Sequence, residues 1–473
     1  MAGEVPPVDK LRNLLRDLKP EARAQLLAEL ERSMSRGQEI PGAALVLKEL
    51  RDSVRAANRQ PDRVGNPARL FYAPIEPFLI DEPGDQAYQG RLSRASLEPI
   101  WAWIGRDLAP AEAKAYSDEA TARLTAGDTA KAEASARAFQ DLVVKRVAET
   151  LATVTSDDKG RRRVAMQVGT PRGLDDINQI VGILKSREAL AAIAGRLPQR
   201  IANLAEEHLE AAKGLIDGSV GGKPDAFVYA LILVMSRLLQ PWQLIRLATK
   251  AADSDLATRI SGTPYAVAVT IVLSEVERFV RQLKSDLKRG QMVEIASLLK
   301  DIHDAARGLR TEINLSIDSP WSRQLAAARA EIAGVLKSEI ESMPGRVRRL
   351  LRPRPVKEIV PGSALDQGDV AETEALIEFV GTCRNYANEL AINEMTLRTY
   401  SDLQHYLETG TSGLVEALRT AGASDRSFRQ SQVDAAVRFC AKVFGQDYAS
   451  TLAKAAGVAA QSERKAAAGA AKA

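Results

Sequence analysis

The most apolar run in the sequence is AFVYALILVMS at 226–236, and it decides what kind of fold the chain can form. The run is 11 residues long and ends at Arg237, whereas a helix needs about 20 apolar residues to cross a bilayer. A second stretch, YAVAVTIVLSEV at 265–276, is also apolar nearly all round. Such helices must be surrounded by others. We therefore expect both at the centre of a multi-helix bundle, with no transmembrane segment.

Composition favours helix along the whole chain. Alanine, the strongest helix former, supplies 75 of the 473 residues, and Arg outnumbers Lys by 45 to 20. Hydrophobic residues make up 45% and charged residues 27%, which excludes collagen-like, disulfide-scaffold and largely disordered chains. The predicted fold class is all-α: a multi-helix bundle with N- and C-terminal helical segments joined by Pro/Arg-rich linkers. The Arg- and Ala-rich usage also indicates a bacterium of high genomic GC content.

Prolines, glycines and charge runs divide the chain into segments. We predict an N-terminal helical segment at 1–62, a helical region at 63–155, a central multi-helix bundle at 156–345, a basic Pro-rich linker at 346–368, a C-terminal helical segment at 369–457 and a disordered tail at 458–473. Central helices are expected at 172–195, 198–216, 224–239, 241–252, 263–289, 291–313 and 319–342. C-terminal helices are expected at 370–408, 412–421 and 428–457.

Two stretches depart from the helical pattern. LFYAPIEPFLIDEPG at 70–84 holds three prolines among large apolar residues, and prolines oppose a long helix. We expect it to be an extended ribbon pinned to a core. SDDKGRRRVAMQVG at 156–169 is the one stretch that suits a hairpin or strand-like interruption.

The cysteine count and the N-terminus indicate the compartment. Cys383 and Cys440 are too few for a disulfide framework. The first residues lack the apolar region of a secretory signal. The sequence thus predicts a cytoplasmic protein.

Motifs for catalysis and metal binding are missing. His208, His303 and His405 are far apart, and none belongs to a His-x-x-x-His or Glu-x-x-His pair. The two cysteines form no CxxC pair for zinc. Ser-x-x-Lys pairs occur without their companion motifs, and no G-x-S-x-G elbow is present. We expect no catalytic, cofactor-binding or metal-ligating residues and no cofactor, which favours, without establishing, a protein that is not an enzyme.

Two clusters of basic residues are the candidate binding sites. They consist of Lys159, Arg161, Arg162 and Arg163, and of Arg346, Arg348, Arg349, Arg352 and Arg354. Arginine forks suit phosphate and carboxylate groups, so nucleic acid or an anionic membrane are possible ligands. The alternative for the second cluster is a helix end whose arginines complement the macrodipole. Stacking aromatics, which single-stranded nucleic acid requires, are missing from the sequence around both clusters.

The sequence supports three functional hypotheses. The leading one is a non-catalytic cytoplasmic helical scaffold or adaptor that contacts an unidentified protein partner through helix faces. The second is a binder of an anionic surface, nucleic acid or membrane, that uses the clusters at 159–163 and 346–354. The third is a helical ligand binder or enzyme with a pocket between the two apolar central helices.

Overall fold

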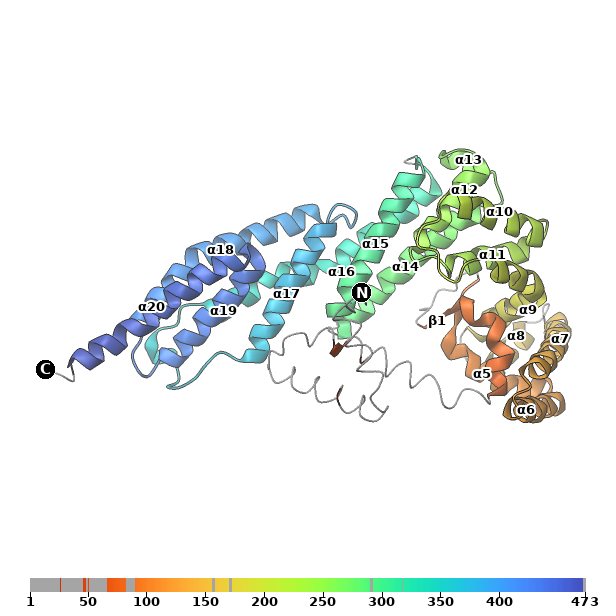
Figure 1. The fold of residues 1–473 in the computed structure, drawn as a ribbon, viewed down its shortest axis with the longest axis horizontal. Coiled ribbons are helices and arrows are strands. Elements are labelled where there is room, and N and C mark those ends of the chain that lie inside the picture. Colours follow the sequence, from red (N-terminus) through yellow and green to blue (C-terminus); the bar gives the residue numbers. More distant parts are fainter. Residues whose placement is uncertain are drawn as a thin grey trace, which may run out of the picture. The chain divides into compact units, whose positions relative to one another are not determined.

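The computed structural model describes residues 26, 46, 47, 50, 66–81, 90–154, 158–169, 172–289, 292–316 and 318–470. Within this part the chain is almost entirely helical, which confirms the predicted all-α fold class (Figure 1). The described residues contain two short strands, β1 (Leu79–Ile80) and β2 (Leu92–Ser93), which form one small sheet. No helix in the described ranges is both long and apolar enough to cross a membrane. The predicted N-terminal segment 1–62 lies almost wholly outside the described residues.

The chain divides into two compact units. The described residues of the first fall within 1–79 and 92–187, and those of the second within 80–91 and 188–470. The division into six segments stays a prediction. Helices of the first unit are α4 (Pro67–Tyr72), a 3₁₀ helix (Ala73–Phe78), a 3₁₀ turn (Arg94–Ser96), α5 (Leu97–Trp103), a π-helical turn (Ile104–Leu108), α6 (Pro110–Thr125), α7 (Thr129–Val154), α8 (Asp158–Val168) and most of α9 (Gly173–Arg196).

Aromatic rings form the core of the first unit. Phe139 of α7 stacks on Tyr116 of α6 with ring centroids 4.7 Å apart, and its centroid lies 5.5 Å from that of Phe71 in α4. The buried Gln140 side chain donates a 2.8 Å hydrogen bond to the Phe71 carbonyl. Rings of this size supply most of the apolar area that a small helical core can bury.

Both predicted departures from helix are wrong in the described residues. Residues 70–78 are α4 and a 3₁₀ helix, and only Leu79–Ile80 is extended. Pro74 is at the second position of the 3₁₀ helix, where a backbone N–H has no partner to lose. The predicted hairpin at 156–169 is helix α8, because Val164 and Val168 are buried one helical turn apart.

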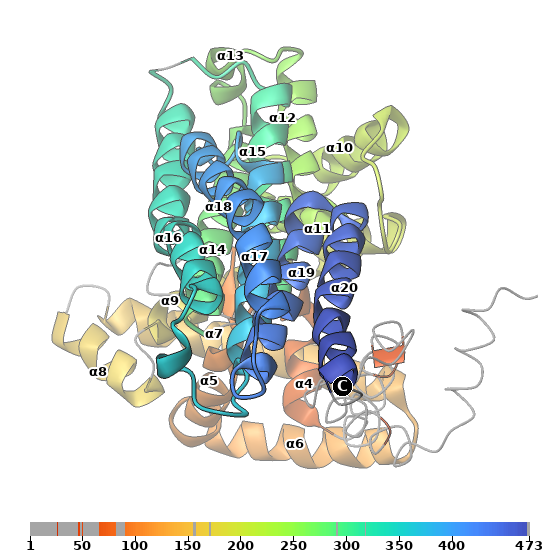
Figure 2. The same cartoon turned by 90° about the vertical axis from the view of Figure 1, so that its left-hand side faces the viewer.

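The second unit contains the two longest helices of the described residues, α16 (Pro320–Leu351) and α18 (Asn393–Arg419) (Figures 1 and 2). After the end of α9 its helices are α10 (Glu206–Val220), α11 (Pro224–Met235), a 3₁₀ helix (Pro241–Leu244), α12 (Ile245–Ala252), α13 (Ala257–Ser261), α14 (Ala266–Arg289), α15 (Met292–Glu312), α16, a 3₁₀ turn (Val356–Glu358), α17 (Gln367–Tyr386), α18, α19 (Arg426–Phe444) and α20 (Gln446–Ala470).

The two apolar stretches are core helices, as the sequence predicts. Every residue of 226–235 in α11 is buried. Helix α11 packs against α10 and α14, and α14 packs in turn against α15 and α16. Gly90 lies against α11 with a left-handed φ of +74°, and a Cβ there would be 2.2 Å from Ile232. Only glycine fits this close approach.

Helix α16 connects two groups of helices within the second unit. It packs against α14 on one side and against α17 and α18 on the other, and α18, α19 and α20 pack on one another (Figure 1). It continues past Pro344 to Leu351, beyond the predicted end at 342. Met343, Val347 and Leu350 are buried, so packing outweighs the hydrogen bond that the proline removes.

The C-terminal helices differ from the prediction in four places. A turn at 387–392 interrupts the helix expected at 370–408, and the one expected at 412–421 is the end of α18. Gly445, with φ of +93°, separates α19 from α20 inside the stretch expected at 428–457. Residues 458–470, predicted to be disordered, belong to α20, where Ala459 is fully buried. Alanine side chains fit close helix contacts, so little apolar volume suffices there.

A buried carboxylate holds residue 91 to α14. Arg91 Nε and Nη2 each lie 2.9 Å from Glu275 Oε1, and Arg278 Nε and Nη2 lie 3.0 and 2.9 Å from Oε2. Burial by itself raises the pKa of Glu275, but the two guanidinium groups outweigh it, so the pKa lies below its usual value. The charged form of Glu275 is therefore the one that the fold stabilises.

This predicts a pH-dependent effect of Glu275→Gln. At pH 7 the variant should be less stable by about 2–3 kcal/mol, since two arginines lose their buried partner. Because the folded pKa is lowered, the wild-type advantage is present above the unfolded pKa of about 4.3 and is lost as the pH falls below it. Urea unfolding midpoints of the wild type and the variant at pH 7 and pH 3.5 measure the loss of stability and its dependence on pH. Glu341→Gln, at an exposed position of α16, is the control; equal effects of the two variants would contradict the prediction.

Gly308 of α15 makes room for an indole ring. A Cβ at residue 308 would lie 2.3 Å from Cε3 of Trp242. Gly308→Ala should therefore destabilise the second unit by about 1–3 kcal/mol despite alanine's higher helix propensity. Gly334→Ala is the matched control, because nothing lies within 4 Å of the added Cβ there; it should be neutral or stabilising by up to about 1 kcal/mol. Thermal and urea unfolding report both, and a stabilised Gly308→Ala would refute the packing argument.

Candidate functional site

The first basic cluster lies on helix α8 of the first unit. Lys159, Arg162 and Arg163 are exposed, whereas the side chain of Arg161 lies outside the described residues. Met166, one turn after Arg162 and Arg163, is 82% exposed. The cluster thus lies on one exposed helix face and not in the hairpin or strand-like interruption predicted for 156–169.

The second basic cluster lies at the C-terminal end of α16. Arg348 and Arg349 are in its last turn, where cations complement the helix dipole. Four of the cluster's arginines contact a neighbouring side chain: Arg346 lies 3.8 Å from Glu372, Arg352 lies 4.0 Å from Glu358, Arg348 lies over the ring of Tyr406 at 5.6 Å, and Arg354 lies over the ring of Phe428 at 5.0 Å. Arg349 is exposed. Tertiary packing therefore supplies the aromatic rings that the local sequence lacks, and arginines of the cluster already occupy them.

Helix α19 satisfies the carbonyl groups at this end of α16. Gln432 Nε2 donates to the carbonyl oxygens of Leu350 at 3.1 Å and Arg352 at 3.0 Å. Arg429 Nη2 donates to the carbonyl oxygen of Arg354. Both donor side chains are buried. The last carbonyls of a helix have no partner within it, so these bonds attach the end of α16 firmly to α19.

The chain after α16 is anchored at several points. Ile359 and Leu365 are buried. The Leu365 N–H donates to Ser431 Oγ at 2.9 Å, and the Gly362 N–H lies 3.4 Å from the Ser424 carbonyl oxygen. The segment 352–366, which the prolines marked as part of a linker, thus lies against α19.

The same anchored segment leaves two apolar side chains in solvent. Val356 is 56% exposed and Val360 is 70% exposed. Arg349 and Arg352 precede them, and both are also exposed. We call the surface made by Arg349, Arg352, Val356 and Val360 the α16-end surface. Sequence reasoning found its arginines but missed its valines, because exposure of an apolar residue in a turn has no sequence signal.

A second polar arrangement in the second unit joins α15 and α16 to the turn at 387–392. Arg310 of α15 donates from Nη1 to both carboxylate oxygens of the buried Glu389, at 3.0 and 2.8 Å. Arg329 of α16 donates from Nε to the Glu389 carbonyl and from Nη2 to the Asn388 carbonyl, both at 2.7 Å. Two arginines from different helices therefore converge on one turn.

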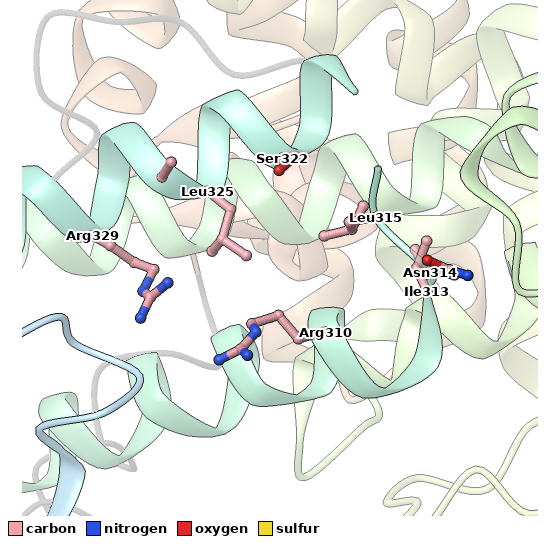
Figure 3. Close-up of a pocket in the computed structure, with 8 residues that line it drawn as sticks. Arg310, Ile313, Asn314, Leu315, Ser322, Leu325 and Arg329 are labelled. Carbon is pink, nitrogen blue, oxygen red and sulfur yellow. The ribbon is translucent and has the colours of Figure 1, made fainter. Parts of the chain in front are cut away.

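These arginines line a pocket of about 280 Å³. Its lining residues are Arg310, Ile313, Asn314, Leu315, Ser322, Leu325, Ala326 and Arg329. Figure 3 shows both guanidinium groups at one end of the space between α15 and α16, with Leu325 beside them and Asn314 and Leu315 toward the other end. Sequence reasoning missed this pocket, because its two arginines belong to ordinary charged helix faces.

The thiols and imidazoles stand apart from this pocket. Burial raises the pKa of Cys383 and of Cys440 to about 12 each, which keeps both thiols neutral. His208 and His405 are exposed, and the His303 ring lies 4.9 Å from that of Tyr386. Among the described residues, no group of three or more His, Cys, Asp or Glu side chains is placed to hold a metal ion.

No protein-family model, curated protein or solved structure matches this chain. The fold defines it as an all-α protein built from two helical units.

The attachment of α16 to α19 predicts a stability effect of Gln432→Leu. Leucine fills a similar volume but leaves the Leu350 and Arg352 carbonyls without a donor, which should cost about 1–3 kcal/mol. Gln430→Leu is the matched control on the same helix, because the Gln430 side chain donates to Asp434 at the surface; it should change stability by less than about 0.5 kcal/mol. Urea unfolding measures both, and equal midpoints for the two variants would show that the carbonyl bonds contribute nothing.

Proposed function

We propose that the protein is a non-catalytic, cytoplasmic bacterial scaffold or adaptor that binds a protein partner through the α16-end surface. The observation that carries the proposal is the exposure of Val356 and Val360 within a segment anchored on both sides. A single exposed apolar residue is ordinary on a protein surface. Two of them in one anchored segment, which follows exposed arginines in the sequence, combine apolar and arginine side chains as protein-binding patches do.

The anchoring supports a role in recognition. The α19 side chains hold the backbone at residues 350, 352 and 354, and the Leu365 N–H bond to Ser431 holds it after the valines. The backbone that carries the arginines and valines is therefore fixed before any partner arrives. A preorganised surface loses less conformational entropy on binding than a mobile one. The partner suited to this surface has an apolar centre that covers the valines and carboxylates at its rim that face Arg349 and Arg352.

The chemistry of the second unit supports the non-catalytic part. Buried carboxylates in it are held in ion pairs: Glu275 on α14 with Arg91 and Arg278, and Glu389 in the turn at 387–392 with Arg310 of α15. Both thiols are buried and neutral, so neither resembles an activated nucleophile. Unpaired buried thiols also suit a reducing compartment.

A second candidate function, the anionic-surface binder, rests on a separate observation. Lys159, Arg162 and Arg163 on α8, and Arg349 and Arg352 later in the chain, are exposed to solvent. Such residues can neutralise phosphates. The binding constant would then fall by about one logarithmic unit per neutralised phosphate for each tenfold rise in salt concentration. This candidate needs no apolar contact, which separates it from the first.

The test is a pull-down from native lysate with the full chain and with Val356→Ser/Val360→Ser. We expect a partner at near-equal stoichiometry, stable to nuclease and salt. The double variant should weaken its binding by about 2 kcal/mol, a roughly thirty-fold loss, since two valines are no longer buried. Val458→Ser is the matched control, because Val458 is 67% exposed on α20. Recovery of the bare chain, or equal capture by the double variant, would overturn the proposal.

The same experiment separates the second candidate. Material that is lost with nuclease or modest salt, and lost with Arg349→Gln/Arg352→Gln but not with the valine variant, would establish anionic-surface binding instead. Retention by both double variants would exclude the α16-end surface from either function.

A further inference from the structure

The pocket between α15 and α16 holds unused hydrogen-bond donors. Arg310 bonds Glu389 through Nη1 alone, and Arg329 uses Nε and Nη2 on the turn carbonyls. The hydrogen bonds that these two arginines make to described residues do not use Arg310 Nε or Nη2 or Arg329 Nη1. Guanidinium groups carry five N–H donors in a planar fork, so each arginine retains donors at the pocket.

Charge at this end of the pocket is unbalanced. Arg310 and Arg329 bring two positive charges, and the Glu389 carboxylate contacts Arg310, whereas Arg329 bonds to the backbone carbonyl of Glu389. Arg329 bonds only to carbonyl oxygens, which leave its charge uncompensated. The Arg310 side chain is about half-exposed, at 48%, so an ion from solvent can reach it.

The remaining walls are suited to a small organic body. Leu315, Leu325 and Ala326 contribute apolar surface, and Asn314 and Ser322 contribute polar groups. Ser322 lies in the first turn of the 32-residue helix α16, where the helix dipole also favours negative charge. A volume of about 280 Å³ is at the low end for ligand pockets, so the occupant is compact.

We infer that this pocket binds a compact organic anion through its oxyanion group. The carboxylate or phosphate oxygens accept hydrogen bonds from the free donors of Arg310 and Arg329, in the forked geometry that arginine forms with such groups. The short apolar part of the ligand lies against Leu315 and Leu325. Because the two arginines also hold the turn at 387–392, the ligand stabilises the contact of α15 and α16 with α17 and α18. This site is independent of the α16-end surface.

The test measures the unfolding temperature of the full chain with sodium phosphate and sodium succinate, each against sodium chloride at equal ionic strength. We expect saturable stabilisation of about 1–3 °C with a half-point in the millimolar range. Arg310→Gln should weaken binding at least tenfold. Arg323→Gln removes the same charge from an exposed position of α16 and should leave binding unchanged. Stabilisation by phosphate alone assigns a phosphate ester, and by succinate alone a carboxylic acid.

A second variant keeps the test decisive if Arg310→Gln folds poorly. Glu389→Gln removes the negative charge that competes for Arg310, while the amide oxygen can still accept from Nη1, so it should tighten anion binding by about three- to tenfold. A purely structural role for these arginines predicts no such gain. The inference is overturned if phosphate and succinate stabilise the wild type no more than chloride does, if Arg310→Gln responds as the wild type does, or if Glu389→Gln binds no more tightly.

Discussion

The end of a helix leaves carbonyl groups without donors, and the second unit depends on how these groups are satisfied. At the ends of α16 and α17, the donors come from side chains of other helices. Gln432 and Arg429 of α19 reach the carbonyls at the end of α16, and Arg329 of α16 reaches those that follow α17. Each bond joins two elements far apart in the sequence. A carbonyl buried without such a donor costs more than an ordinary hydrogen bond contributes, so these contacts fix which helices are neighbours.

Arginine is better suited than lysine to bond to carbonyl groups of another helix. Its planar fork reaches two carbonyls at once, as Arg329 does through Nε and Nη2. Arg310 needs Nη1 alone for both oxygens of the Glu389 carboxylate. The same geometry leaves further donors pointing elsewhere. A residue that joins helices can therefore also present donors to an anion, which is why a structural contact and a candidate ligand pocket share side chains here. The α16-end surface is similar, because its exposed arginines and valines belong to a segment that contacts with α19 hold in place.

Prediction from sequence succeeded where one local property decides the outcome. The burial of 226–235 follows from an apolar run too short for a membrane, and α9, α12, α14 and α15 lie close to the predicted helices. It failed where packing overrules local preference. Residues 158–168 are helical because Val164 and Val168 find a buried position, and residues 458–470 continue α20 because Ala459 does. The proline at 344 is likewise accommodated inside a helix with a buried face.

The sequence by itself determined the all-α class, the apolar centre of the second unit and the positions of the basic residues. These depend on helix propensity, hydrophobic pattern and charge, which are properties of short stretches. Only the tertiary structure decided which arginines are occupied and which are available. It placed Tyr406 and Phe428 over Arg348 and Arg354, left Val356 and Val360 in solvent, and brought Arg310 and Arg329 to one pocket. The physical reason is that the contacts of a guanidinium group depend on acceptors and rings that lie on other helices. No local sequence pattern encodes how close those groups come.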